Sequence, residues 1–375
     1  MSDITRSSTV TPIARGGWLD GLRIAVALMI VLYHFRSAAP VPLDQIHPVF
    51  DRGYLLTNFF IIDSGYVLGR IYYRRLIDGR TSAGLYIRQR FLRVVPAHLV
   101  VMIAFAGLVL GTAAIGMTPS NPYWFAWSAY PAQFFLVQAY GVPGGHGWNA
   151  PTWTLSALLG CYLLLPGLLR LAHRLPPWAL LIGAAVLALA ANAATQAFLG
   201  YPVYRMPLGY GILRALPLFI LGVAMAAFAA RVPVRPRLGA TLGLVSVAAL
   251  AGFQAVGEFA IPSLALICAI IFTAGAIPVV KSVKLVETLA LASFSIFLTN
   301  ELVRIIWFAA FDAAGQAQWS DTVRWIVWGL GLGAAVAGAI VFRQAFDRPS
   351  QAWFTARLSS GPLGRSLPKD PPPAL

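Results

Sequence analysis

Long apolar blocks separated by short polar segments recur along the chain from Leu19 to Phe346. About 20 helical residues cross the roughly 30 Å hydrocarbon core of a bilayer, so each apolar block of that length predicts a membrane-spanning helix. The pattern therefore predicts an all-α, polytopic bundle of about ten transmembrane helices. The blocks cover approximately residues 19–36, 53–71, 94–117, 152–171, 178–200, 211–230, 239–256, 260–280, 287–311 and 322–342.

Composition supports a membrane protein. The 375 residues are 58% hydrophobic and 11% charged, and the mean hydropathy is +0.73. We expect one membrane domain over residues 18–346, because no long polar stretch interrupts the apolar blocks. A polar tail precedes it at residues 1–17, and we expect a flexible, Pro-rich tail at residues 347–375.

The net charge of +15 raises nucleic acid as a partner, but the basic residues lie between apolar blocks and carry no nucleic-acid-reading motif. The basic residues are instead distributed unequally between the two sets of alternating segments. Twenty Lys and Arg fall in one set of alternating segments, against five in the other, at Arg36, Arg52, Arg205, Arg214 and Arg324. Since positive segments stay in the cytoplasm, both termini are predicted to be cytoplasmic, and membrane lipids are the expected partners.

Ionisable side chains inside a membrane are costly and suggest function. The first predicted helix holds Arg23 and His34, eleven positions apart, on one face and about 16 Å from each other. They could line one channel, or be an interfacial anchor and an unrelated histidine. Asp63 on the second helix lies at a depth near Arg23, which suggests an ion pair. Glu301 and Arg304 on the ninth helix have the i, i+3 spacing of a pair that neutralises itself.

The segment between the third and fourth predicted helices, residues 118–151, carries no Lys, Arg, Asp or Glu. It is rich in aromatic residues, which suggests either an interfacial aromatic belt or a stacking surface for a sugar-like acceptor. The two cysteines, Cys161 and Cys268, lie within apolar blocks, so the sequence indicates neither a disulfide framework nor a metal site.

Five segments in order resemble the acyltransferase-3 family of membrane acyltransferases. WLDGLRIAVALMIVLYHFR at 18–36 has the family's Arg and His separated by ten residues. FFIIDSGYVLG at 59–69 is similar to its second helix, and IRQRFLRVVPAH at 87–98 to its Arg-x-x-Arg entry to the third. WNAPTWTLSALLGCYLLLPGLL at 148–169 and ASFSIFLTNELV at 292–303 resemble two later segments. The resemblance covers nearly all of the chain.

This resemblance implies an acyl-CoA-dependent O-acyltransferase of the bacterial cytoplasmic membrane. Acyl-CoA, most commonly acetyl-CoA, would be the co-substrate, without a metal, and the acceptor would be a hydroxyl of an extracytoplasmic glycan or lipid-linked sugar. His34 would be the general base, because an imidazole titrates near neutral pH. Arg23, Arg90 and Arg93 would bind the anionic donor. Supporting candidates on the same segments are Asp63, Ser64, Trp153, Ser156, Asn300 and Glu301.

Three residues depart from the family pattern. Leu158 stands where a glutamate is usual, Asn300 where a histidine is common, and Asp63 where an apolar residue is usual. A transporter or flippase is the alternative function, since many carriers combine ten helices with intramembrane charges. The sequence leaves open the identity of the acceptor and whether the protein is a homo-oligomer.

Overall fold

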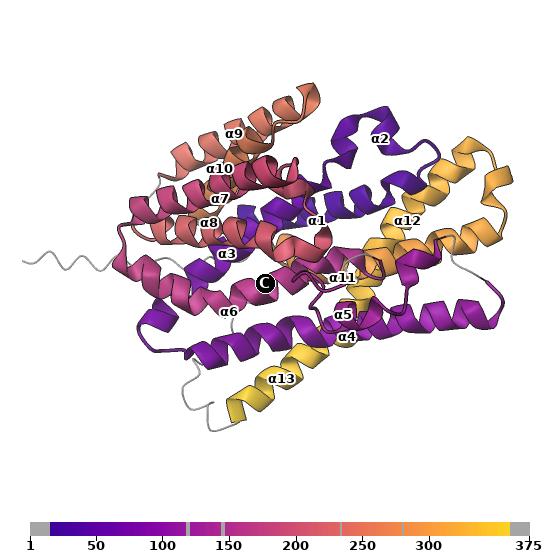
Figure 1. Ribbon diagram of the computed structural model, residues 1–375, viewed down its shortest axis with the longest axis horizontal. Helices are drawn as coiled ribbons and strands as arrows, with labels where there is room; N and C mark the ends of the chain where they lie inside the picture. The colour runs from indigo at the N-terminus through magenta and orange to yellow at the C-terminus, as the bar shows by residue number, and fades with distance from the viewer. Residues whose placement is uncertain (1–15, 118–120, 144–146, 233–234, 280, 361–375) are drawn as a thin grey trace, which may run out of the picture.

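A computed structural model describes residues 16–117, 121–143, 147–232, 235–279 and 281–360. The described residues form helices, turns and loops, with no β-strand among them. The long helices run side by side along the long axis of the molecule (Figure 1). The predicted all-α polytopic bundle is therefore confirmed.

Ten long helices match the ten predicted apolar blocks. They are α1 (Trp18–Phe35), α3 (Gly53–Ile77), α4 (Ala83–Ala114), α6 (Trp153–Arg174), α7 (Pro177–Leu199), α8 (Gly211–Ala229), α9 (Pro236–Val256), α10 (Ala260–Ala276), α11 (Lys284–Ala313) and α12 (Asp321–Phe342). Shorter helices are α2 (Leu43–Ile46), α5 (Tyr130–Phe134) and α13 (Arg348–Ser360). In the described ranges, eight helices are long and apolar enough to cross a membrane. The other two of the ten are α3 and α10, which has only 17 residues.

Helix α3 is the polar centre of the bundle. It contacts α1, α6, α8 and α10, and it buries Asn58 and Asp63 along with its apolar residues. These neighbours separate it from lipid, so its polar side chains can be satisfied within the protein. In contrast, α7 and α9 bury few side chains and present large apolar ones, such as Phe198 and Leu244, to the outside. Such a surface suits contact with lipid.

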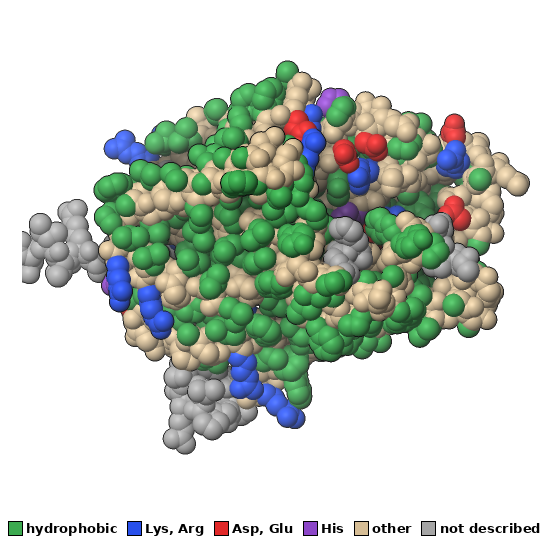
Figure 2. Space-filling view, in the orientation of Figure 1, with side chains coloured by type: hydrophobic (Ala, Val, Ile, Leu, Met, Phe, Trp, Pro, Cys, Tyr) green, Lys and Arg blue, Asp and Glu red, His purple; other side chains and the backbone are tan. Residues whose placement is uncertain are grey.

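Contacts between connecting segments define two ends of the bundle. At the end that holds the beginning of α1, here called the inner end, the Val283 N–H donates to the Gly16 carbonyl (3.4 Å). At the opposite, outer end, Arg52 donates to the Gly257 carbonyl (2.6 Å). On the face in Figure 2, the visible acidic side chains lie toward the outer end, at the right, whereas the inner end shows basic ones without them. The chain alternates between the ends as the loop charges require.

Two boundaries differ from the prediction. Helix α4 begins at Ala83 rather than near residue 94, because the Ser82 hydroxyl caps it by accepting from the Leu85 N–H (3.1 Å). The expected flexible tail from residue 347 is helical over α13, where the Gln351 side chain donates to the Leu92 carbonyl (2.9 Å). The remainder of that tail, from residue 361, and residues 1–15 of the N-terminal tail lie outside the described residues.

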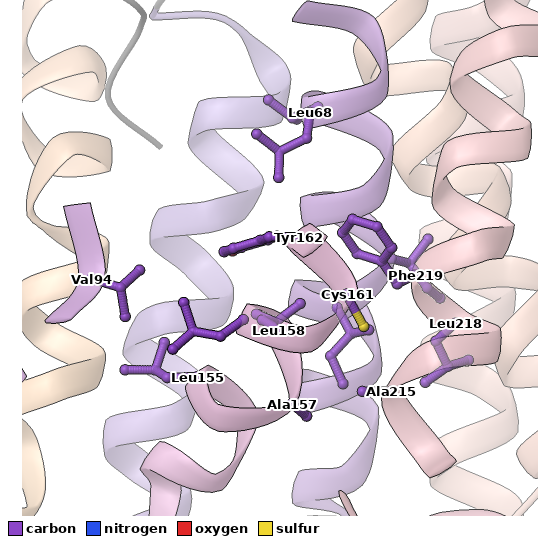
Figure 3. Packing of buried hydrophobic residues seen from close by; sticks show 14 of the residues in the cluster. Leu68, Val94, Leu155, Ala157, Leu158, Cys161, Tyr162, Ala215, Leu218 and Phe219 are labelled. Atoms are coloured by element: carbon purple, nitrogen blue, oxygen red, sulfur yellow. The ribbon is translucent and has the colours of Figure 1, made fainter. Parts of the chain in front are cut away.

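Close packing of α8 against its neighbours forms the core. In Figure 3, Ala157 and Cys161 of α6 lie beside Ala215 and Phe219 of α8. Glycines allow α3 and α8 to approach even more closely. A Cβ atom on Gly222 would lie 2.1 Å from the Ile62 carbonyl oxygen, so this contact between two helix backbones requires glycine.

The Gly222→Ala substitution should destabilise the bundle, because one helix must move to accept the methyl group, at a cost of about 1–3 kcal/mol. The measurement is the melting temperature of the purified protein in detergent. Gly183→Ala on α7 is the matched control, since a Cβ there meets nothing within 4 Å. Equal melting temperatures for the two variants would contradict this account of α3–α8 packing.

Candidate functional site

A cavity of about 960 Å³ lies at the outer end of the bundle. The end of α1 contributes His34, α3 contributes Tyr54 and Thr57, and α11 contributes Glu301. Trp124 and Trp153 also line it, which brings the aromatic segment before α6 to the same space. This outer cavity therefore brings His34, Trp153 and Glu301, three sequence-predicted site residues, to one space.

A second cavity of about 110 Å³ lies deeper in the bundle. It gathers Arg23 from α1, Asp63 and Ser64 from α3, and Arg90 and Arg93 from α4. Its remaining walls are largely apolar and include Val94, Leu155, Leu158 and Tyr162, which Figure 3 shows at the facing sides of α4 and α6. This inner cavity is therefore an apolar space with arginines in its lining.

The two cavities share four lining residues, Ile30, Thr57, Thr154 and Phe297, here called the neck. Ile30 is four residues before His34, so it lies on the same face of α1 and about 6 Å below it. The Thr57 and Thr154 hydroxyls donate to the backbone carbonyls of Gly53 (3.2 Å) and Pro151 (3.0 Å). The neck joins the cavities without presenting a free hydroxyl proton.

His34 is held by Asn300. The Asn300 amide nitrogen donates to the carbonyls of Ile296 (2.9 Å) and Phe297 (2.7 Å), so its oxygen faces His34 Nδ1 at 2.5 Å. An amide oxygen only accepts, and Nδ1 must therefore carry the proton of the neutral ring. This tautomer leaves the lone pair of the ring on Nε2, in the arrangement that a general base needs.

Glu301 adds a negative charge beside this histidine. Its carboxylate accepts from Arg304 Nε (2.9 Å) and Nη2 (2.5 Å), which confirms the predicted i, i+3 pair. Glu301 and Arg304 do more than neutralise each other within α11, because both side chains line the outer cavity with His34.

Arg23 forms the predicted ion pair with Asp63. Arg23 Nε donates to Asp63 Oδ2 at 2.7 Å, and its Nη1 lies 3.4 Å from Asp20. All three side chains are buried. The second carboxylate oxygen of Asp63 is buried without a hydrogen-bond partner in the described part of the protein, so this pair retains acceptor capacity toward the inner cavity.

Arg90 and Arg93 are one turn apart on α4 and reach the inner cavity from a different side. Arg93 forms an ion pair with Asp347 (2.7 Å), the residue that precedes α13. Arg90 donates to the Tyr72 hydroxyl (3.1 Å), and no carboxylate pairs with it among the described residues. Among the described residues, the positive charge of Arg90 is therefore the one in this cavity without a counter-charge.

The aromatic segment before α6 folds onto the bundle. Trp148 is 1% exposed and packs against Trp127 and Tyr130, with ring centroids 4.9 and 4.6 Å apart. The aromatic residues that suggested a belt or a stacking surface are Tyr123, Trp124, Trp127, Tyr130, Tyr140 and Trp148. Tyr123, Trp124, Trp127 and Tyr140 are exposed, and Trp124 lines the outer cavity. Residues 118–120 and 144–146 lie outside the described residues.

Two polar residues of the segments that resemble the family, Ser156 and His98, form hydrogen bonds with the backbone of the aromatic segment. Ser156 donates to the Leu136 carbonyl (2.7 Å) and accepts from the Ala139 N–H (3.2 Å), and it lines neither cavity. His98 Nε2 lies within hydrogen-bond distance, 2.9 Å, of the Gln133 carbonyl oxygen. Both residues attach the aromatic segment to α6 and α4.

The outer cavity also contains residues that the sequence analysis did not select. Tyr54 stacks on Tyr204 with centroids 4.2 Å apart, and the Tyr204 hydroxyl donates to Glu258 (2.7 Å). Burial, and then this hydrogen bond, raise the pKa of Tyr204 to about 12, so the hydroxyl keeps its proton at neutral pH. Arg52 and Arg214 are further members. The sequence did contain a sign of them, because both belong to the five basic residues of the predicted extracytoplasmic segments.

Comparison with known proteins identifies the family of the chain. The model of the acyltransferase-3 family, described as an acyltransferase domain, matches residues 17–344. The chain belongs to this family. The match includes α1 through α12 and thus every residue that lines either cavity. No solved structure matches the chain significantly.

Two curated relatives match parts of the chain. Acyltransferase MdmB of Streptomyces mycarofaciens is 29% identical over 166 residues, which is 42% of this chain and 40% of that protein. Protein 2 in the picA locus of Rhizobium radiobacter is 28% identical over 102 residues, 26% of this chain and 48% of that protein. The chain thus spans less than half the length of either relative. Family membership and the long apolar helices of the described residues indicate a multi-pass membrane protein of the acyltransferase-3 family.

The Asp63→Asn substitution should destabilise the protein by about 3 kcal/mol, because it leaves Arg23 buried with only the more distant Asp20 as a counter-charge. Denaturation of the purified protein in detergent measures this. Asp321→Asn is the control, since Asp321 forms an exposed pair with Arg324, and its loss should cost no more than about 1 kcal/mol. An equal, small effect of the two substitutions would show that the buried pair contributes little.

Proposed function

We propose that the protein transfers an acyl group, most commonly acetyl, from cytoplasmic acyl-CoA to a hydroxyl of an extracytoplasmic glycan or lipid-linked sugar. The observation that carries the proposal is the pair of adjoining cavities. One holds arginines, the other holds a histidine with a defined tautomer, and the neck between them lies one helical turn from that histidine. Donor and acceptor can therefore meet while each remains on its own side.

The donor suits the inner cavity. Coenzyme A carries several negative charges, and guanidinium groups bind phosphate through paired hydrogen bonds. Arg90, which has no carboxylate partner in the described ranges, is the group that would attract it. Arg23 and Arg93, the other predicted donor ligands, are paired with Asp63 and Asp347 and would add hydrogen-bond donors rather than net charge. The volume of about 110 Å³ suits an acyl thioester rather than a nucleotide. In this proposal, the nucleotide stays at the inner end and the thioester extends to the neck.

The acceptor hydroxyl would enter the outer cavity and donate its proton to His34 Nε2 as its oxygen attacks the thioester carbonyl. The carbon–sulfur bond then breaks, and the proton held by His34 passes to the departing thiolate, which leaves as free coenzyme A. Asn300 keeps the ring in the required tautomer, and the Glu301 carboxylate favours the transient imidazolium. An ester on the acceptor and a free thiol are the products.

The proposed setting is the bacterial cytoplasmic membrane, with a surface polysaccharide or its lipid-linked precursor as the acceptor. The excess of basic residues at the inner end supports this orientation. The relative MdmB is named an acyltransferase, which supports the reaction type.

His34→Ala should reduce acyl transfer by about a hundredfold or more, the usual contribution of a general base. The measurement is transfer of label from radiolabelled acetyl-CoA to the membrane glycolipid fraction, or hydrolysis of the thioester. His173→Ala is the matched control, because His173 lies in the last turn of α6 at the inner end. Full activity of His34→Ala would refute the mechanism. Transport of a sugar without label transfer would favour a carrier.

Asn300→Leu should lower kcat by a smaller factor, about tenfold, because the ring loses the acceptor that selects its tautomer. Asn300→Asp should retain more activity, since a carboxylate still accepts from Nδ1. Steady-state kinetics with acetyl-CoA measure both variants, and their melting temperatures control for folding. Wild-type kcat in a folded Asn300→Leu protein would contradict the orienting role.

A further inference from the structure

The outer cavity has an excess of positive charge. Five arginines line it, against three carboxylates, at Arg36, Arg52, Arg205, Arg214, Arg304, Asp51, Glu258 and Glu301. Three ion pairs use all the acids, at Arg36–Asp51 (2.8 Å), Arg205–Glu258 (3.2 Å) and Arg304–Glu301 (2.5 Å). Within the described ranges, Arg52 and Arg214 are therefore left with neutral partners. Apart from these charged residues and the tyrosines, His34 is the other titratable group that lines the cavity.

The bonds of Arg214 are all to neutral groups. Its guanidinium donates to the carbonyls of Tyr204 (3.2 Å) and Tyr54 (3.1 Å) and to the Asn58 side chain (3.1 Å). It is 5% exposed, and its Nε has no hydrogen-bond partner among the described residues. A buried charge without a counter-charge is costly. An anion that enters the cavity would reduce this cost.

Arg52 keeps unused donors. Its Nη1 donates to the Gln254 carbonyl (2.8 Å), the Gln254 side chain (2.7 Å) and the Gly257 carbonyl (2.6 Å). These bonds leave Nε and Nη2 without a partner in the described structure and fix the guanidinium at the cavity wall. The arginine is thus anchored on one side and can donate to a ligand with the other.

The distribution of basic residues along the chain points to the same place. Arginines are disfavoured in extracytoplasmic segments, and only five lie in that set. Four of these five, Arg36, Arg52, Arg205 and Arg214, line this one cavity. Topology alone does not account for such a concentration, whereas binding of an anion does.

We propose that the acceptor carries an anionic group, a phosphate or a carboxylate, that binds to Arg52 and Arg214 in the outer cavity while its hydroxyl faces His34. The inference rests on the proposed function and narrows its acceptor to acidic glycans or phosphate-linked sugars. The stacked rings of Tyr54 and Tyr204 line the same cavity, and Arg214 donates to the backbone carbonyls of both residues. These rings would offer an apolar face to the sugar.

Binding of three soluble probes tests the proposal. Glucose 1-phosphate, glucuronate and methyl glucoside are titrated against the purified full-length protein in detergent, with calorimetry or thermal shift as the readout. We expect at least one anionic sugar to bind more tightly than methyl glucoside and to bind more weakly in high salt. The phosphate and carboxylate probes distinguish the two sources of charge. Equal binding of all three sugars would overturn the proposal.

Arg52→Gln should weaken binding of the anionic probe by about tenfold to a hundredfold, the usual effect of losing a charge-assisted hydrogen bond. Arg324→Gln is the control, because Arg324 is at the outer end but pairs with Asp321 and does not line the cavity. Arg214→Lys retains the charge and serves as a second variant where Arg214→Gln does not fold. Unchanged anion binding in both Arg52→Gln and Arg214→Gln, or in Arg52→Gln where Arg214→Gln does not fold, would overturn the proposal.

His34→Ala separates this inference from the proposed function. That variant should still bind the anionic probe, because His34 is not one of the proposed anion ligands, but should not transfer label. Normal transfer by His34→Ala, together with arginine-dependent anion binding, would refute the mechanism and leave the anion site standing. Loss of transfer with no preference for anionic sugars would refute the anion site alone.

Discussion

A charge inside a bilayer must be paired or shielded from lipid, and this constraint determines how the bundle is arranged. Helix α3, too polar to face lipid, is surrounded by other helices. Its Asp63 meets Arg23 of α1, and on α4 Arg93 meets Asp347 near the chain's end. Each pair joins segments that are distant in sequence, so the charges that a membrane protein must neutralise also hold its helices in register around the inner cavity.

Much of the fold could be predicted from hydrophobic blocks, because a transmembrane helix has a fixed length and an apolar surface. The Arg23–Asp63 pair also followed, since the depth of a residue in a helix depends only on its position in the sequence. The start of α4 could not be predicted from the apolar blocks, because the arginines before residue 94 limit the apolar block but lie within the helix. The helical α13 was also missed, since an acidic residue beyond the last span gives no sign of its partner Arg93.

The three departures from the family pattern become intelligible in three dimensions. Asp63 is a counter-charge for Arg23, and Asn300 provides the oxygen that selects a tautomer of His34. Leu158 lines the inner cavity and keeps that wall apolar. The pairing of Asp63 was predicted from its depth, whereas the roles of Asn300 and Leu158 were not visible from a single sequence, because their neighbours lie on different helices. Arg52 and Arg214 were missed for a related reason: the loop-charge argument treated them as exceptions to a count, and only the structure shows that they line the same cavity.

The neck has a consequence for the membrane as an insulator. Ile30 and Phe297 are apolar, and the hydroxyls of Thr57 and Thr154 donate to carbonyls of their own segments. Water and ions therefore find few partners where the two cavities meet, and an apolar constriction resists wetting. In the proposed mechanism the acyl thioester reaches this neck, whose lining is poorly suited to a hydrated ion. Such a protein could modify molecules across the bilayer without discharging the ion gradients that the bilayer maintains.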